Sequence, residues 1–200
     1  MLISDTHNMH HALHLPPPDQ VDLLIHAGDF CTYGNEEHIN SFNSWLATLH
    51  YKHKVVIAGN HENSKQAYIR QRLTNAVFLE HASYDCEGFL IFGTKFFWKC
   101  PHGNAYYDQI PSHTDVLVAH MPAEGYFDGC YGCPTLKKRL MEIRPKLFVC
   151  GHIHGAYGCS YGSEKDGLGG TFIANASQVG PGDSEITDHK PILIEIRKTQ

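Results

Sequence analysis

Five apolar runs of this chain stop directly before side chains that can bind a metal ion or move a proton. In open α/β sheets, ligands bind beyond the carboxyl ends of the strands. A single Asp or His after a strand is usually a cap or turn residue, but the same arrangement repeated five times favours one shared site. The side chains in these positions are Asp5 and His7, Asp29, Asn60 and His61, His120, and His152 and His154.

The types of donor in this set indicate which metals it would suit. Carboxylate, imidazole and amide donors without thiolates suit Zn, Fe, Mn or Co better than an iron–sulfur centre. A single tetrahedral ion would use only four of them. Two ions that share a carboxylate would use them all. The sequence therefore predicts a centre of two divalent metal ions.

The elements that must position these side chains can be predicted from the apolar pattern. Apolar, largely β-branched runs predict buried strands before each group, at 1–3, 21–27, 54–58, 115–119 and 146–150. Apolar residues at steps of three and four predict a helix at 36–50, and further helices are expected at 65–73 and at 134–143, which begins with proline. Shorter strands are expected at 76–79, 83–86, 89–92, 171–174 and 192–196.

This order of elements predicts an α/β fold. Continuous apolar strands separated by helices indicate a sheet covered on both faces. The later strands with short turns indicate a second, more antiparallel sheet. We therefore expect a four-layer α-β-β-α sandwich of two mixed sheets, with the metals at the C-terminal strand ends, formed by residues 1–200 as a single domain.

Composition narrows the classes of partner. A net charge of −5 leaves no basic surface for nucleic-acid binding, so no nucleic-acid partner is expected. No apolar run is long enough for a membrane-spanning helix. Seven scattered cysteines without an apolar leader favour reduced thiols and a cytoplasmic location. The pair Cys130 and Cys133 has no second pair at zinc-finger spacing. The sequence does not indicate an oligomeric state.

The motifs occur in the order found in a known family. Asp5-x-His7, Gly28-Asp29, Gly59-Asn60-His61-Glu62, His120 and Gly151-His152-x-His154 resemble the motifs of the calcineurin-like metallophosphoesterases. The resemblance implies that Asp5, His7 and His154 bind one ion, that Asn60, His120 and His152 bind the other, and that Asp29 bridges both. It implies that His61 is a general acid and that a hydroxide bridging the metals attacks the phosphorus. Glu62 is expected to be a structural partner of nearby groups.

The stretch after Asp29 bears on the type of ester. Protein phosphatases of this superfamily carry an arginine shortly after that Asp, and none is present in 30–34. A diester carries one less charge and matches such a site better. The segments 42–46 and 144–147 resemble the metallophosphoesterase-domain-containing subgroup, which is similar to class III cyclic-nucleotide phosphodiesterases. This implies hydrolysis of cyclic nucleotides or similar phosphodiesters; the alternatives are a phosphomonoesterase and a non-catalytic scaffold.

Some residues outside the motifs are candidates for contact with a small phosphoester or nucleotide substrate. Asn60, His61 and Asn175 are the predicted substrate contacts. The long segment 93–114 is rich in aromatic residues from Phe96 to Tyr107, and it either packs in the core or covers the site and stacks on a base. His26 is expected to be a hydrogen-bonded core residue.

Overall fold

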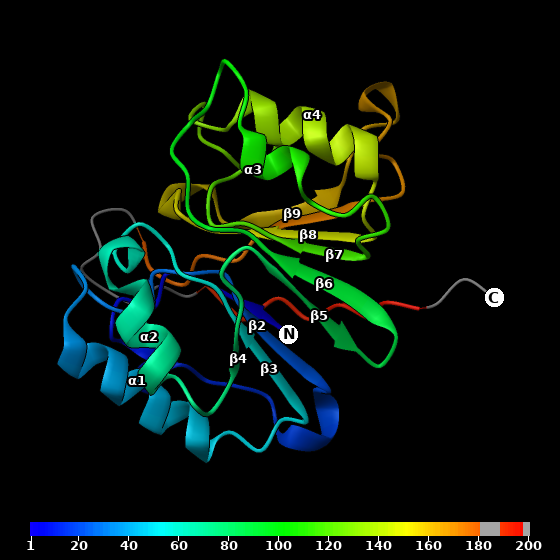
Figure 1. The fold of residues 1–200 in the computed structure, drawn as a ribbon. Coiled ribbons are helices and arrows are strands. Elements are labelled where there is room, and N and C mark those ends of the chain that lie inside the picture. The colour runs from blue at the N-terminus through cyan, green and yellow to red at the C-terminus, as the bar shows by residue number, and fades with distance from the viewer. Residues whose placement is uncertain (181–188, 198–200) are drawn as a thin grey trace.

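The computed structural model describes residues 1–180 and 189–197. Two sheets pack face to face, and helices cover their outer faces (Figure 1). Figure 1 places α1 (Glu36–Thr48) and α2 (Gln66–Arg72) on the first sheet, and α3 (Ala105–Asp108) and α4 (Pro134–Ile143) on the second. This is the predicted four-layer α-β-β-α sandwich.

The first sheet contains four parallel strands in the order β1-β2-β3-β4. They are β1 (Leu2–Ile3), β2 (Leu23–His26), β3 (His53–Val56) and β4 (Val77–Phe78). α1 begins where the Asn35 side chain accepts hydrogen bonds from the backbone N–H groups of Glu37 and His38, which caps the first turn. Its residues Ile39, Phe42, Trp45 and Leu46 are buried against this sheet.

The second sheet contains six strands in the order β5-β6-β7-β8-β10-β9. They are β5 (Ala82–Cys86), β6 (Phe89–Gly93), β7 (Val116–Val118), β8 (Leu147–Cys150), β9 (Gly158–Tyr161) and β10 (Phe172–Asn175). The sheet is mixed because β5–β6 and β9–β10 are antiparallel and the other pairs are parallel. Short 3-10 helices lie at η1 (His10–Ala12), η2 (Pro18–Gln20), η3 (Asn63–Lys65), η4 (His154–Ala156) and η5 (Glu164–Asp166).

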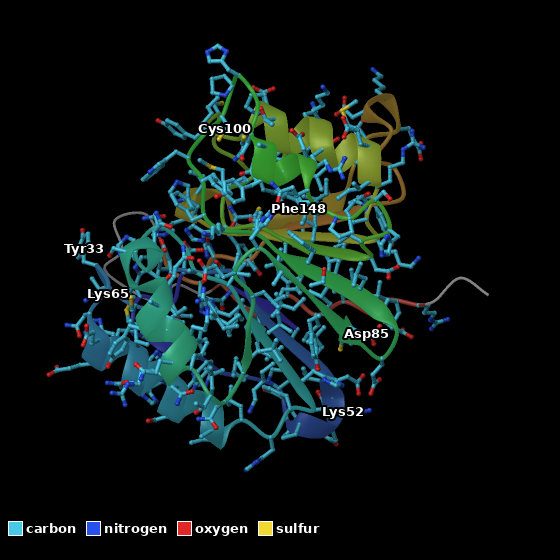
Figure 2. The ribbon with its side chains drawn as sticks, in the orientation of Figure 1. Tyr33, Lys52, Lys65, Asp85, Cys100 and Phe148 are labelled. Carbon is cyan, nitrogen blue, oxygen red and sulfur yellow. The ribbon has the colours of Figure 1, made fainter. Side chains whose placement is uncertain are left out.

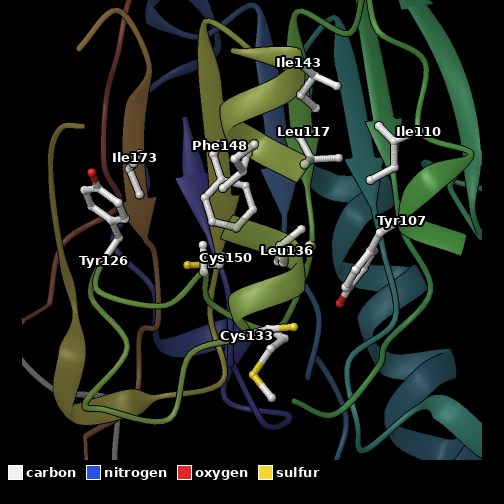
Figure 3. Packing of buried hydrophobic residues seen from close by; sticks show 14 of the residues in the cluster. Tyr107, Ile110, Leu117, Tyr126, Cys133, Leu136, Ile143, Phe148, Cys150 and Ile173 are labelled. Carbon is white, nitrogen blue, oxygen red and sulfur yellow. The ribbon is translucent and has the colours of Figure 1, made fainter. Parts of the chain in front are cut away.

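Both faces of the central strands are buried, which explains why their sequences are apolar throughout. Residues such as Ile25, Val55 and Val149 form a core between the two sheets. On the outer face of the second sheet, Phe148 and Leu136 belong to another core beneath α4 (Figure 3). The sandwich holds the strand ends in fixed positions relative to one another.

Three details of the strands differ from the sequence prediction. The first sheet is parallel across its four strands, and its one antiparallel contact among the described residues is an isolated bridge between Leu2 and Ile192. The expected strand at 192–196 was wrong, because that bridge is its only ladder contact within the described chain. Strand β9 was not predicted because Gly158–Tyr161 is partly exposed and lacks an apolar pattern.

The two ends of the sandwich differ in character. Tyr33 and Lys65 lie at one end and Lys52 and Asp85 at the other (Figure 2). The far end carries the exposed ion pair of Lys52 with Glu87. The candidate site lies at the Tyr33 end. No helix among residues 1–180 and 189–197 has the length and apolar character needed to cross a membrane.

Candidate metal centre

The loops after β3, β7 and β8 bring one group of donor atoms together. Asn60 Oδ1 lies 2.8 Å from His152 Nδ1 and 3.1 Å from His120 Nε2. His120 Nε2 is also 3.1 Å from Asp29 Oδ2. The other ring nitrogen, Nδ1, lies 2.8 Å from the carbonyl oxygen of Ala27 and is placed to donate to it. That hydrogen bond turns Nε2 towards the oxygens of Asn60 and Asp29, as outer partners do for metal-binding histidines.

The carboxylates near His120 favour a positive charge at this point of the site. Burial would lower the pKa of His120, but the nearby carboxylates of Asp29 and Asp5 outweigh it and raise that pKa to about 9. The side chains of His120, Asp29 and Asp5 are almost completely buried. A divalent cation on the same atoms would supply the positive charge that these two carboxylates draw to this point. The donor set fits such an ion.

A second group surrounds Asp5 at the end of β1. His154 Nε2 lies 3.2 Å from Asp5 Oδ1 and 3.3 Å from His7 Nε2. The backbone N–H of His152 donates to both carboxylate oxygens of Asp5, and the Ser177 hydroxyl donates to Oδ2 at 2.9 Å. Burial opposes ionisation of Asp5, but His120 and His154 outweigh it and hold its pKa well below the ordinary value.

Asp29 connects the two groups. Its ligand atoms lie within 4.8 Å of those of His120 and His152, and also within 4.8 Å of those of His7 and His61. The His61 backbone N–H donates to Asp29 Oδ1 at 2.9 Å, and Oδ2 faces His120. A carboxylate in this position can serve two ions at once. The geometry therefore fits a pair of ions with a shared ligand.

Glycines precede the site residues because the backbone segments approach one another closely. A Cβ atom on Gly59 would lie 2.1 Å from Asp29 Oδ1, and one on Gly151 would lie 2.1 Å from Asp5 Oδ2. A Cβ atom on Gly28 would lie 2.8 Å from His120 Nδ1. The three glycines thus leave room for the carboxylates and imidazole that form the centre.

Four of the site residues adopt left-handed backbone conformations. The φ angles of Asp5, His7, Asp29 and His152 are +53°, +41°, +54° and +68°. Each such conformation in a non-glycine residue costs on the order of 1–3 kcal/mol and persists where surrounding contacts fix it. Strain of this kind collects at functional sites, so these four residues support a functional role for the centre.

Glu62 holds two of these loops together, as expected of a structural partner. One of its carboxylate oxygens accepts from the backbone N–H groups of Asp29 and Gly59, both at 2.9 Å, and the other accepts from Cys31 N–H at 2.8 Å. The side chain is fully buried. Burial and the nearby Asp29 raise the pKa of Glu62 to about 7.

His61 lies at the rim of the centre, next to a residue that sequence reasoning missed. Its Nδ1 accepts a hydrogen bond from the Tyr33 backbone N–H at 3.1 Å, which leaves the proton of the neutral ring on Nε2. Nε2 lies 3.9 Å from Asp29 Oδ2. The Tyr33 ring stacks on His61 with centroids 4.7 Å apart and is 82% exposed. No sequence pattern indicated this contact.

Asn175 does not fit the predicted role of substrate contact. Its Nδ2 donates to the carbonyl oxygens of Phe127 and Ile153, and its Oδ1 accepts from the backbone N–H of Ser177. These bonds engage the whole amide, and the residue is fully buried. Asn175 instead orients Ser177, which contacts Asp5.

The aromatic segment lies against the centre, with one ring in the core and one exposed. Phe96 is buried, with its ring 5.6 Å from those of His120 and His152. Trp98 is 63% exposed, with its ring 5.5 Å from that of His152.

His26 is a buried core residue, as predicted, with Nε2 3.0 Å from the Thr6 hydroxyl. All seven cysteines are free thiols.

Comparisons with known proteins show the family to which the chain belongs. A model of the calcineurin-like phosphoesterase family matches residues 1–156. Metallophosphoesterase domain-containing protein 1 of Homo sapiens is 31% identical over 199 residues, covering 78% of this chain and 60% of that protein. A UPF0046 protein of Caenorhabditis elegans is 30% identical over 228 residues, covering 98% of this chain and 74% of that protein. The chain thus spans only about 60% of the length of the human relative.

The fold is also similar to that of a solved structure. TT1561 of Thermus thermophilus superimposes with a TM-score of 0.62 over 87% of this chain and 86% of that one. The two sequences are 12% identical. This likeness supports the two-sheet architecture.

Proposed function

Because this chain belongs to the calcineurin-like phosphoesterase family, we propose that it is a phosphodiesterase that works with two divalent metal ions. The observation that carries the proposal is that Asp29 belongs to two groups of possible ligands, one with His120 and His152 and the other with His7 and His61. In this proposal Asp5, His7 and His154 hold one ion, Asn60, His120 and His152 hold the other, and Asp29 contacts both. The nitrogen and oxygen donors suit Mn, Fe, Zn or Co.

When bound, such ions acidify water and offset negative charge on phosphoryl oxygens. The chain itself supplies the orientation of the ligands and a proton donor. His61 turns Nε2 towards the centre, because the Tyr33 backbone N–H lies at Nδ1. We assign His61 as the general acid that protonates the departing ester oxygen from Nε2.

The positions of the arginines favour a diester over a monoester. A dianionic monoester is commonly held by a guanidinium group, which matches phosphate with two parallel hydrogen bonds. In the described residues the arginines are engaged elsewhere. Arg70 pairs with Glu80, Arg72 lies over Tyr68, Arg139 contacts Glu142 and Ile110, Arg144 contacts Met141, and Arg197 pairs with Glu195.

The test compares two chromogenic esters on metal-loaded protein. We expect measurable hydrolysis of bis(p-nitrophenyl) phosphate and much slower hydrolysis of p-nitrophenyl phosphate. The reverse order would identify a monoesterase. A pure protein that contains two ions, yet hydrolyses neither ester nor a panel of other diesters, would overturn the assignment as an enzyme and favour a scaffold.

A His61 variant tests the assigned proton donor. His61→Asn should lower kcat by roughly 10²–10⁴-fold for a diester with an alkoxide leaving group, the usual contribution of general acid catalysis, and much less for bis(p-nitrophenyl) phosphate, whose leaving group needs no proton. The metal content by elemental analysis should stay at the wild-type level, because His61 is not one of the proposed ligands. Loss of metal together with activity would show that His61 is a ligand instead.

A further inference from the structure

A groove of about 520 Å³ lies beside the candidate centre. One wall is the aromatic segment after β6, with Phe96, Trp98 and Tyr106, and the other is η3 and the start of α2, with Asn63 and Gln66. Asn63 follows the Asn60–Glu62 loop directly, and its backbone N–H lies 3.5 Å from the Asn60 carbonyl oxygen. The groove therefore begins where the loop that carries Asn60 and His61 ends.

The aromatic wall joins the groove to the centre. The rings of Phe96 and Trp98 lie 5.6 Å and 5.5 Å from that of His152, and Phe96 lies 5.6 Å from that of His120. His152 is one of the residues assigned to an ion. A phosphoryl group held at the centre would thus place one of its ester arms next to Trp98.

The groove offers both a flat apolar surface and polar groups. Trp98 is 63% exposed although it is among the largest apolar side chains. Gln66 Nε2 donates to Asn63 Oδ1 at 2.9 Å, while Gln66 Oε1 is a buried acceptor with no hydrogen-bond partner among the described residues. Lys95 and Glu80 also line the groove and form an ion pair, with Lys95 Nζ 3.3 Å from Glu80 Oε1. Trp98 and Gln66 thus line one groove with an exposed indole and an amide acceptor, the kinds of group that bind planar rings with N–H groups.

We propose that this groove is a subsite for a planar aromatic ring carried by one arm of the phosphodiester. Trp98 stacks on the ring, and Gln66 Oε1 accepts a hydrogen bond from an N–H group at the ring edge. This inference rests on the proposed function of the neighbouring centre and narrows it to diesters with a heteroaromatic arm. It also assigns Trp98 as a specificity residue that touches substrate without taking part in the reaction.

A fluorescence measurement tests the groove without any need for activity. The chain has two tryptophans, and Trp45 is buried in α1 while Trp98 is exposed. Adenosine 5′-monophosphate should quench the emission of the protein, and ribose 5-phosphate should not. Trp98→Leu should abolish the quenching. Equal quenching by ribose 5-phosphate, or quenching that survives in the Trp98→Leu protein, would overturn the proposal.

Kinetics with a matched pair of substrates gives the second test. The p-nitrophenyl ester of thymidine 5′-phosphate and methyl p-nitrophenyl phosphate share a leaving group and differ only in the other arm. Trp98→Leu should raise KM for the thymidine ester about tenfold, consistent with the usual strength of base stacking, and leave the methyl ester unchanged. Trp98→Phe keeps an aromatic ring, so KM for the thymidine ester should stay close to the wild-type value.

The control is Tyr161→Ala, which removes another exposed aromatic residue from β9. This variant should leave KM unchanged for both substrates. Equal losses for both substrates in Trp98→Leu would mean that Trp98 acts through His152, and the subsite assignment would fail. If the wild-type protein hydrolyses neither diester, the proposed function fails, and the quenching experiment still decides whether the groove binds aromatic rings.

Discussion

Gly59→Ala is the sharpest test of how the centre is built. The added Cβ would lie 2.1 Å from Asp29 Oδ1 and 2.7 Å from the Asp29 backbone nitrogen, whereas ordinary contacts begin near 3.4 Å. The carboxylate must therefore retreat by about 1.3 Å, the difference between 3.4 and 2.1 Å. The backbone cannot follow easily, because Glu62 holds the N–H groups of both Asp29 and Gly59.

The size of the effect should differ between stability and activity. Overpacking at one methyl group typically costs about 1–3 kcal/mol, and each kcal/mol corresponds to roughly 2–4 °C in Tm for a domain of this size. The variant should thus remain folded with a Tm lower by about 2–12 °C. A displacement near 1 Å at reacting groups can lower turnover by roughly 10²-fold. Since Asp29 belongs to both donor groups, we expect weaker binding of both ions.

The assay combines thermal unfolding in EDTA, metal content after loading, and hydrolysis of bis(p-nitrophenyl) phosphate. Gly170→Ala is the matched control, because a Cβ atom there meets nothing within 4 Å. It should leave all three measurements at the wild-type level. If the Gly59→Ala protein binds two ions with wild-type affinity, the close approach to Asp29 is not the reason why residue 59 is a glycine.

Three further changes probe other parts of the structure. Glu62→Ala leaves three buried backbone N–H groups without an acceptor, so unfolding in urea should show a loss of roughly 3 kcal/mol or more; a loss below about 1 kcal/mol would contradict this. Asn60→Ala should reduce the bound metal to one ion per chain by elemental analysis, and retention of two would remove Asn60 from the ligand set. Burial lowers the pKa of His10 to about 4 in the folded state, so the unfolded chain binds its proton more readily. The free energy of unfolding should therefore fall as pH drops from about 6.5 to 4, and His10→Phe should flatten that part of the profile.

The positions of the donor residues could be predicted because one physical rule covers them. Apolar residues buried on both faces mark the strands, and the side chains just past each strand meet at a common edge. Asp29, Asn60 and His120 were placed together in this way, and the structure brings His120 Nε2 to 3.1 Å from both Asn60 Oδ1 and Asp29 Oδ2. The helices at 36–50 and 134–143 were predicted because their apolar faces follow the helical period.

Other features depend on tertiary contacts that no local pattern encodes. Asn175 follows a strand just as Asn60 does, but its amide meets the Phe127 and Ile153 carbonyls rather than the open site. Residues 192–196 alternate as a strand would, yet beyond Ile192 they form no ladder with a neighbour in the described chain. The stacking of Tyr33 on His61 depends on a loop whose path the sequence does not specify.

The strained backbone gives a physical reason to expect that bound ions and folding support one another. Of the eleven non-glycine residues with positive φ within 1–180 and 189–197, four are in the proposed ligand set: Asp5, His7, Asp29 and His152. At about 1–3 kcal/mol each, this strain is comparable to the whole stability of a typical domain, which is roughly 5–15 kcal/mol. The buried strands on either side must offset it, which is why the centre lies at the edge of a sandwich apolar on both faces of its sheets. A ligand that binds only the folded chain adds about 2.7 kcal/mol at a hundred times its Kd. Metal ions that use these strained carboxylates and imidazoles would therefore offset much of the cost of arranging them.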